Sequence, residues 1–280
     1  MKLTRTIEET REEIAKARES GRVVGFVPTM GALHKGHMTL VRNAREQCDF
    51  VVVSIFVNPT QFGPNEDLAK YPRTLESDLR KCEDAGVDLV FAPSASEMYP
   101  EGFDRWVEVD GPTDVLEGAR RPGHFRGVTT VCAKFFDIVR PSFAFFGRKD
   151  YQQLVIVGKL VRDLEGPITI VPVDTVRESD GLATSSRNVY LSSSERQAAL
   201  VLSRSLQAAQ RAFDSGERRV RSLQSTAENM IGAEPLAKID YVAMVDAETL
   251  GPIETIERPA VLLLAVRIGA TRLIDNVLLG

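Results

Sequence analysis

The sequence predicts an α/β protein in which a doubly wound parallel sheet domain, residues 1–175, is followed by a smaller α+β domain, residues 176–280. Two patterns carry this prediction. Short apolar runs alternate with helical segments through the first 175 residues, as expected for strands buried on both faces of a parallel sheet. After residue 192, two helical segments precede three β-like runs separated by turn residues, which is typical of a small antiparallel sheet.

Composition describes a soluble globular protein without a basic surface. The 280 residues are 43% hydrophobic and 26% charged, with a net charge of −4 and a pI of about 5.6. We therefore expect no nucleic acid partner and no membrane-surface binding. Three scattered cysteines and an N-terminus without the apolar core of a signal peptide predict a cytoplasmic protein. The longest apolar run, 260–266, is too short to span a bilayer.

The first half of the chain contains three predicted strands, 23–27, 49–58 and 87–93, and Pro28 should end the ladder of the first. Helices are expected at 6–20, where Thr6 and Glu9 have capping-box spacing, at about 75–85, and from His37 onward. Residues 94–123 lack periodicity, so we expect loops that could form a lid, with a short strand at 106–109.

The second half begins with a helix at 127–139, a strand at 143–147, a helix at 150–164 and a strand at 168–173. Ser192 and Glu195 form a second capping box for a long helix to about Phe213. Another helix at 220–231 and strands at 239–246, 260–269 and 271–279 complete the prediction.

The most informative stretch is 22–37, where an apolar strand ends in a turn that holds two of the three histidines of the chain. Gly31 permits the turn, and His34 and His37 have H-x-G-H spacing around Gly36 at the start of a helix. Backbone N–H groups and the dipole at a helix start favour anions such as phosphate. Surface or capping histidines are the simpler interpretation, but composition argues against it, because two of only three histidines fall within this one turn. A zinc site is disfavoured, because Cys48, Cys82 and Cys132 are widely separated.

Other polar turns follow the predicted strands, at the edge where open α/β sheets bind ligands. Asn58 and Gln61 follow the second strand, although such residues are also ordinary turn formers. Arg120, Arg121 and Arg126 flank the third histidine, His124, and we favour contact with phosphate or carboxylate over a solvated turn. Lys149 begins a helix, where an ammonium suits the dipole only if an anion lies nearby.

Residues 176–188 form a further polar stretch, in which Ser185 and Ser186 precede Arg187. Serines are common in linkers. A hydroxyl pair followed by arginine is instead suited to clamping a triphosphate.

These strings together resemble one family. PTMGALHKGH is similar to the signature of the H-x-G-H nucleotidylyltransferase superfamily, and in particular of the pantothenate synthetase family. SIFVNPTQF, YPRT, RPGHFRGV, FFGRKDYQQ, VRESDGLATSSRN and TRLIDN extend the resemblance over almost the whole chain. It implies a Rossmann-like nucleotide- and pantoate-binding domain followed by a small domain that covers the active site. It also implies joining of (R)-pantoate to β-alanine with ATP, through a pantoyl adenylate, with release of pyrophosphate and AMP.

The resemblance also implies roles for single residues. His37 matches the family's catalytic residue, and His34 and Lys149 are suited to stabilising the charge that develops on the phosphates. Gln61 and Gln153 match the glutamines that hold pantoate, and Gln61 also lies where β-alanine arrives. Asn58 is a third substrate-binding candidate. Residues matching the ATP-binding segments are Met30, Gly31, Ala32, Leu33, His34, Lys35, Gly36, His37, Gly147, Arg148, Lys149, Asp150, Val176, Thr184, Ser185, Ser186 and Arg187.

Two positions depart from the family pattern. The family commonly has Met where this chain has Thr184, and Glu where it has Arg148. Mg²⁺ should bridge the ATP phosphates, with Asp78 and Asp150 as candidate outer contacts. The resemblance further implies a homodimer. Two other functions stay open: a different adenylyl- or cytidylyltransferase on the same fold, and a nucleotide-binding module without activity.

Overall fold

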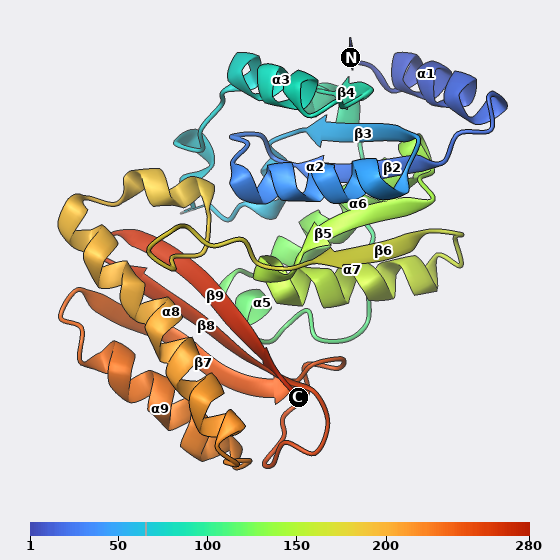
Figure 1. Ribbon diagram of the computed structural model, residues 1–280. Helices are drawn as coiled ribbons and strands as arrows, with labels where there is room; N and C mark the ends of the chain where they lie inside the picture. Colours follow the sequence, from blue (N-terminus) through green and yellow to red (C-terminus); the bar gives the residue numbers. More distant parts are fainter. Residues whose placement is uncertain (65) are drawn as a thin grey trace. The chain divides into compact units, whose positions relative to one another are not determined.

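A computed structural model describes residues 1–64 and 66–280 (Figure 1). The chain divides into two compact units, of which the first comprises Met1–Arg148 and Gln153–Asp174 and the second Lys149–Gln152 and Thr175–Gly280. The predicted domain boundary lies between residues 175 and 176. Two parts of the predicted first domain, residues 149–152 and Thr175, belong to the second unit instead.

The first unit is built on a six-stranded sheet in the order β1-β4-β3-β2-β5-β6, and all of its strand pairs are parallel. The strands are β1 (Lys2–Thr4), β2 (Val24–Thr29), β3 (Phe50–Ile55), β4 (Leu89–Phe91), β5 (Phe143–Gly147) and β6 (Thr169–Val173). Its α-helices are α1 (Ile7–Glu19), α2 (Lys35–Gln47), α3 (Leu75–Asp84), α4 (Ala95–Met98), α5 (Glu117–Arg120), α6 (His124–Val139) and α7 (Tyr151–Asp163), whose first two residues group with the second unit. The doubly wound fold is confirmed.

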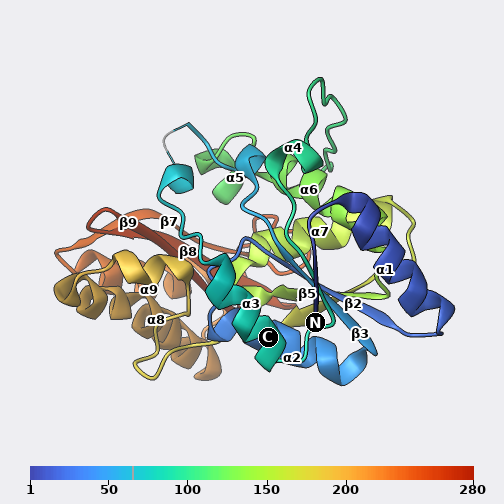
Figure 2. The ribbon, with the colours of Figure 1, turned by 90° about the horizontal axis from the view of Figure 1, so that it is seen from above.

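Strand side chains alternate between two apolar cores, one on each face of this sheet. Phe26, Val52 and Leu89 pack with α1, α6 and α7, whereas Val27 and Val53 pack with α2 and α3. Figure 2 shows α2 and α3 on one side of the strands and α1 and α6 on the other. This double burial explains why the strands are continuously apolar in sequence.

Three local predictions need correction or extension. Pro28 does not end its ladder, because β2 pairs with β3 as far as Thr29. The pairing of β2 with β5 involves only Gly25 and Phe26. Pro28 therefore lies beyond that ladder, where the N–H donor that proline lacks is not needed. The three-residue strand β1 was not predicted; it is too short to show periodicity.

The predicted strand at 106–109 was wrong. Val107 donates its N–H to the Thr130 hydroxyl at 3.0 Å and accepts a hydrogen bond from the Thr129 hydroxyl, so side chains of α6 satisfy its backbone. Without a neighbouring strand, this apolar segment lies irregularly against the helix.

The second unit contains an antiparallel sheet in the order β7-β8-β9, as predicted. Its strands are β7 (Ala237–Asp246), β8 (Ala260–Ile268) and β9 (Thr271–Leu279), and α8 (Ser193–Asp214) and α9 (Val220–Gly232) cover one face (Figure 1). Ser192 and Glu195 form the predicted capping box of α8, and Thr6 and Glu9 form that of α1. Short 3₁₀ helices are η1 (Pro59–Gln61), η2 (Asp67–Ala69), η3 (Arg148–Asp150) and η4 (Ser186–Tyr190).

Candidate active site

The sheet topology points to one edge of the first unit. Strand order reverses between β2 and β5, since the chain continues from β2 outward to β3 and β4, and then returns to β5 on the other side. Open α/β sheets bind ligands beyond the carboxyl ends of strands at such a switch point. The turn after β2 carries the predicted residues 30–37. Gly147 is the last residue of β5, and Arg148 follows it.

Asp78 holds the turn after β2 in place. Its buried carboxylate accepts hydrogen bonds from Ala32 N at 2.9 Å and from Leu33 N at 2.8 Å, one on each oxygen. The Thr74 hydroxyl donates to the carboxylate at 3.1 Å. The turn needs this support because Gly31 and Ala32 both have positive φ angles, 80° and 51°, which cost free energy for alanine. Asp78 therefore fixes the backbone that leads into the two histidines.

Replacing Asp78 with asparagine should destabilise the folded protein through this turn. Asp78→Asn keeps the shape of the side chain but places an NH₂ group against a backbone N–H donor. We expect the free energy of unfolding to fall by about 1–3 kcal/mol, the cost of an unsatisfied buried polar group. Urea titration measures this loss. Asp84→Asn, at the exposed end of the same helix, is the matched control, and equal stability of the two variants would contradict this role for Asp78.

The two histidines stack on each other at the start of α2. Their ring centroids lie 4.0 Å apart with an interplanar angle of 26°, and His34 is the N-cap residue. His34 N donates to His37 Nδ1 at 3.3 Å, so a neutral His37 carries its proton on Nε2. Gly36 leaves room for this stack, since a Cβ there would lie 3.0 Å from His34 Cε1. The His34 ring therefore lies close to the backbone at Gly36.

A buried amide network links the turn after β3 to the turn after β2. Asn58 Nδ2 donates to Gln61 Oε1 at 3.0 Å and to Gly127 O at 3.1 Å, and Gln61 Nε2 lies 3.1 Å from Met30 Sδ. Both amides are buried. The structure therefore brings the predicted residues Asn58, Gln61 and Met30 together. Gln153 lies near the start of α7, half-buried.

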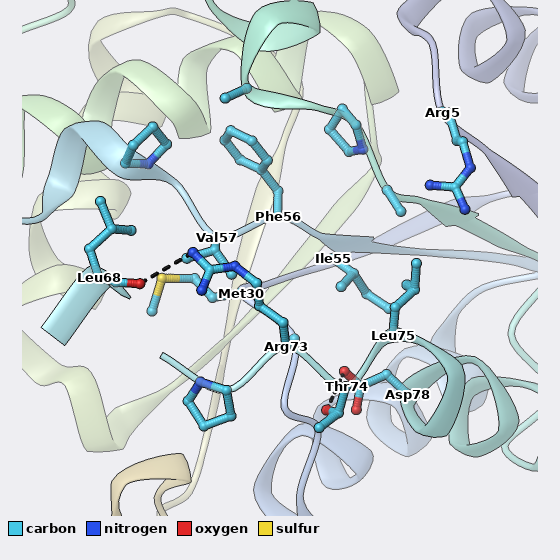
Figure 3. Close-up of a pocket in the computed structure, with 16 residues that line it drawn as sticks. Arg5, Met30, Ile55, Phe56, Val57, Leu68, Arg73, Thr74, Leu75 and Asp78 are labelled. Carbon is cyan, nitrogen blue, oxygen red and sulfur yellow. Dashed lines mark hydrogen bonds between the residues drawn. The ribbon is translucent and has the colours of Figure 1, made fainter. Parts of the chain in front are cut away.

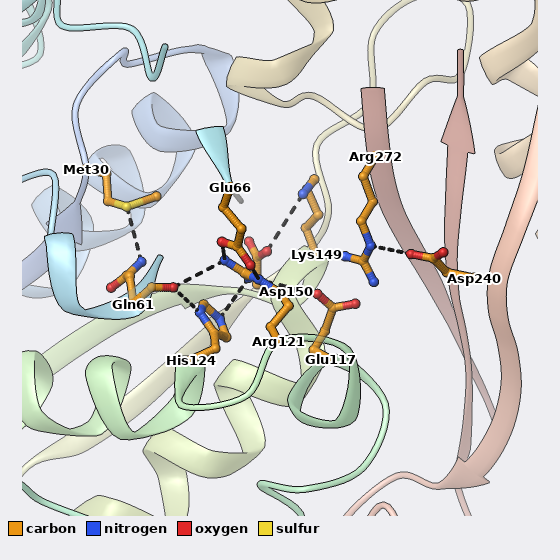
Figure 4. Close-up of polar contacts among 10 residues, drawn as sticks. All are labelled: Met30, Gln61, Glu66, Glu117, Arg121, His124, Lys149, Asp150, Asp240 and Arg272. Atoms are coloured by element: carbon orange, nitrogen blue, oxygen red, sulfur yellow. Dashed lines mark hydrogen bonds and ion pairs between the residues drawn. The ribbon is translucent and has the colours of Figure 1, made fainter. Parts of the chain in front are cut away.

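The cationic cluster around His124 is paired internally. Arg121 makes two hydrogen bonds of 2.7 Å to the Glu66 carboxylate, and its Nη1 lies 3.0 Å from His124 Nε2. His124 Nδ1 lies 2.8 Å from Gln61 O, and Figure 4 marks this contact with a dashed line. Burial, reinforced by the Arg121 charge, lowers the pKa of His124 to about 4. Neutral His124 thus donates from Nδ1 to Gln61 O and accepts from Arg121 at Nε2. The predicted anion contact of Arg121 stays a prediction.

Acid should destabilise the protein through His124, which faces Arg121, Glu117 and Glu66. Its pKa is about 4 in the folded chain and 6.5 without the fold, so the unfolded chain binds more protons between these values. Its contribution to stability is therefore complete above pH 6.5 and is lost as pH falls towards 4. We expect a loss of about 2 kcal/mol between pH 7 and pH 5. Denaturant titrations of the wild type and His124→Asn measure this loss; an equally steep pH dependence in the variant would contradict it.

The second unit holds the other predicted nucleotide residues. Thr184 N donates to Val176 O at 2.9 Å, which closes a hairpin, and Ser185 caps η4 by accepting from Arg187 N at 3.3 Å. The Thr184 side chain is buried, and its hydroxyl has no hydrogen-bond partner among residues 1–64 and 66–280. Lys149 Nζ lies 3.8 Å from Asp150 Oδ1 (Figure 4). In the first unit, Arg148 Nε lies 3.1 Å from Asp174 Oδ1, which offsets the charge of this departure from the family pattern.

The first unit contains a cavity of about 410 Å³, which the sequence did not predict. Figure 3 draws the residues that line it. Part of its wall belongs to the turn after β2 and to its support, through Met30, Gly31 and Asp78. Arg73 also lines the cavity. Arg73 donates to Leu68 O and to Tyr71 O, both at 3.2 Å. This lining comes from five separate chain segments, so no local pattern could reveal it.

The described residues do not favour a reactive cysteine thiolate or a protein-bound metal ion. Burial raises the pKa of Cys48 to about 11 and those of Cys82 and Cys132 to about 12, so all three thiols stay protonated at neutral pH. The part of the chain that the structure describes holds no group of three or more His, Cys, Asp or Glu side chains arranged to bind a metal ion. Among its helices, none has the length and apolar character that crossing a bilayer requires.

Comparison with known proteins identifies the family. The family model described as pantoate-beta-alanine ligase matches residues 2–278. Pantothenate synthetase of Heliobacterium modesticaldum is 58% identical over 97% of this chain and 98% of its own length, and that of Pelotomaculum thermopropionicum is 55% identical over 100% and 99%. The crystal structure of pantothenate synthetase from Thermus thermophilus is 49% identical and superposes with a TM-score of 0.94, covering 99% of both chains.

A second solved structure carries ligands. Pantoate-beta-alanine ligase from Francisella tularensis, crystallised with beta-gamma ATP and β-alanine, is 34% identical and superposes with a TM-score of 0.81, covering 99% of this chain and 97% of its own. Matches over the whole length in sequence and in fold leave one conclusion. The chain belongs to the pantoate–β-alanine ligase family.

Proposed function

We propose that the chain condenses (R)-pantoate with β-alanine at the expense of ATP, giving pantothenate, AMP and pyrophosphate in the biosynthesis of coenzyme A. The observation that carries this proposal is the family match over residues 2–278, with relatives named pantothenate synthetase at 50–58% identity. The stacked histidines beside the switch point also support it, because imidazole N–H groups can donate to phosphate oxygens.

The first half reaction is in-line attack of the pantoate carboxylate on the α-phosphorus of ATP. A bond forms between carboxylate oxygen and phosphorus, the bond to the bridging oxygen breaks, and pyrophosphate leaves with the electron pair. No covalent enzyme intermediate is needed, so positioning and charge stabilisation account for catalysis. His37 Nε2–H is a fixed donor for this charge, and His34 supports it by stacking. The β-alanine amine then attacks the acyl carbon, and AMP leaves.

We assign ATP binding to the residues that match the family's ATP-binding segments. They are Met30–His37, Gly147, Arg148, Lys149, Asp150, Val176 and Thr184–Arg187. The buried Thr184 hydroxyl supports this assignment, because a polar group without a protein partner is costly unless a ligand or water pairs with it.

Mg²⁺ should enter chiefly with the ATP phosphates, whose charge it neutralises. Asp78 does not suit a metal-ligand role, because both its oxygens already accept backbone hydrogen bonds. Asp150 is half-exposed beside Lys149 and remains a candidate outer contact.

Pantoate is assigned to Gln61 and Gln153, with Asn58 orienting Gln61, because neutral amides can bind hydroxyl and carboxylate groups without adding charge. Gln61→Ala should weaken pantoate binding at least about tenfold while leaving the Kd for ATP within about twofold, as expected for the loss of a buried hydrogen bond. Gln153→Ala should behave alike. Calorimetry that shows ATP affinity lost and pantoate affinity intact would overturn this division of roles.

The decisive experiment is incubation with ATP, Mg²⁺ and pantoate, with and without β-alanine. Rapid AMP formation that requires both organic substrates supports the proposal. Pyrophosphate formation that ignores pantoate and β-alanine would indicate another nucleotidylyltransferase, and ATP binding without turnover would indicate a silent nucleotide-binding module.

We also propose a homodimer in the cytoplasm. The family resemblance supports the dimer, and three cysteines without disulfides fit a reducing compartment. Light scattering of the purified protein tests the dimer, and a mass of about 31 kDa, that of one chain, would refute it.

A further inference from the structure

The strand β9 carries two adjacent polar residues, Asp275 and Asn276, that the proposed function leaves unexplained. Both are buried, and they pair in the sheet with Leu264 and Leu263 of β8. Two successive polar side chains inside an apolar sheet cost free energy unless each is hydrogen-bonded. Their partners therefore indicate why they are there.

Asp275 holds the hairpin that presents Val176 and Thr184. Its carboxylate pairs with Arg177 through two hydrogen bonds, Nη1 to Oδ2 at 2.7 Å and Nη2 to Oδ1 at 2.9 Å. Arg177 Nη1 also donates to Gly181 O at 3.2 Å, across the tip of the same hairpin. Bidentate pairs fix orientation as well as distance. Asp275 thus sets the hairpin against β9.

Asn276 holds the backbone of Lys149. Its Nδ2 donates to Lys149 O at 2.9 Å across 127 residues of sequence, and its own N–H donates to Asp275 Oδ1 at 2.8 Å. A second tie lies two residues further, where the Tyr151 hydroxyl donates to Ala247 O at 3.0 Å. These bonds explain why residues 149–152 group with the second unit although they follow β5 directly in the chain.

We propose that Asp275 and Asn276 are positioning residues that hold two nucleotide-binding segments of the second unit in place. Asn276 positions Lys149, and Asp275 positions the segment from Val176 to Arg187. This inference rests on the proposed function, which assigns both segments to ATP. A lysine acts on a phosphate only when its ammonium is correctly placed, and misplacement by about 1 Å can cost about 100-fold in rate. A single strand carrying both anchors keeps the two segments in a constant relation.

Asn276→Asp tests the link to Lys149. The substitution preserves size but replaces the donor with a carboxylate that faces the Lys149 carbonyl. We expect single-turnover adenylate formation to fall about 10- to 100-fold, while the KM for β-alanine changes less than twofold. Asn229→Asp, on the exposed face of α9, makes the same chemical change and should keep the wild-type rate. Asn276→Ala removes the donor without adding charge and replaces Asn276→Asp if the latter does not fold.

A double-mutant cycle with Lys149→Ala separates positioning from general destabilisation. If Asn276 acts through Lys149, the substitution at 276 should slow adenylation less than about twofold when Lys149 is already alanine. All rates are measured well below the melting temperature of each variant. With an active wild-type chain, equal losses in both backgrounds would overturn this inference alone. An inactive wild-type chain would overturn the proposed function, and this inference with it.

Discussion

His37→Ala should reduce the rate of adenylate formation by about 100- to 1000-fold, the usual loss when one fixed donor to a transition state is removed. The backbone N–H of His34 donates to Nδ1 of His37, so the proton of the neutral ring lies on Nε2, the nitrogen that we assign to a phosphate oxygen. The ground-state affinity for ATP should change much less, because this donor acts mainly on charge that develops during the reaction.

Pyrophosphate release in a single turnover measures this loss. His37→Gln retains an N–H donor and should recover part of the rate. Arg42→Ala, on the exposed face of the same helix, should have no effect on the rate. Near-normal pyrophosphate release from His37→Ala would remove His37 from the mechanism.

The site could be predicted from sequence where its geometry is local. Val24 to Val27 form an apolar run that predicts a buried strand, and Gly31 permits the turn. The two histidines lie three positions apart at the helix start. The sheet was predictable for a similar reason, since double burial imposes continuous apolar runs on its central strands.

The supporting contacts could not be predicted, because they join residues distant in sequence. Asp78 stands in the polar string LESDLRKCED, yet its carboxylate binds a backbone turn 45 residues earlier. Asn276 reaches Lys149 across 127 residues. Val107 failed as a strand because two threonine hydroxyls satisfy its backbone instead of a neighbouring strand. Sequence patterns therefore predict the reacting groups better than they predict the groups that hold them in place.

Lys149→Ala should have opposite effects on the free and the ATP-bound protein. Lys149 stands in η3 directly before α7, where the positive end of the helix dipole disfavours an ammonium, and Asp150 offers only a 3.8 Å ion pair. Without ATP the variant should therefore be as stable as the wild type or slightly more so. Its backbone carbonyl still accepts from Asn276, so the substitution does not remove that anchor.

With ATP and Mg²⁺ the variant should lose part of the stabilisation by ligand, and its adenylation rate should fall about 100-fold or more, because a charge-assisted contact to the phosphates is gone. Lys149→Arg should recover only part of the rate, since a planar guanidinium cannot replace a compact ammonium between phosphates. Thermal melts with and without nucleotide, paired with single-turnover adenylation, measure both effects. The contrary outcome is a variant that melts at a lower temperature without ATP, yet keeps the full rise in melting temperature with nucleotide and the full adenylation rate. Lys149 would then be a structural residue, because a contact to bound phosphate should affect both the nucleotide-induced rise and the rate.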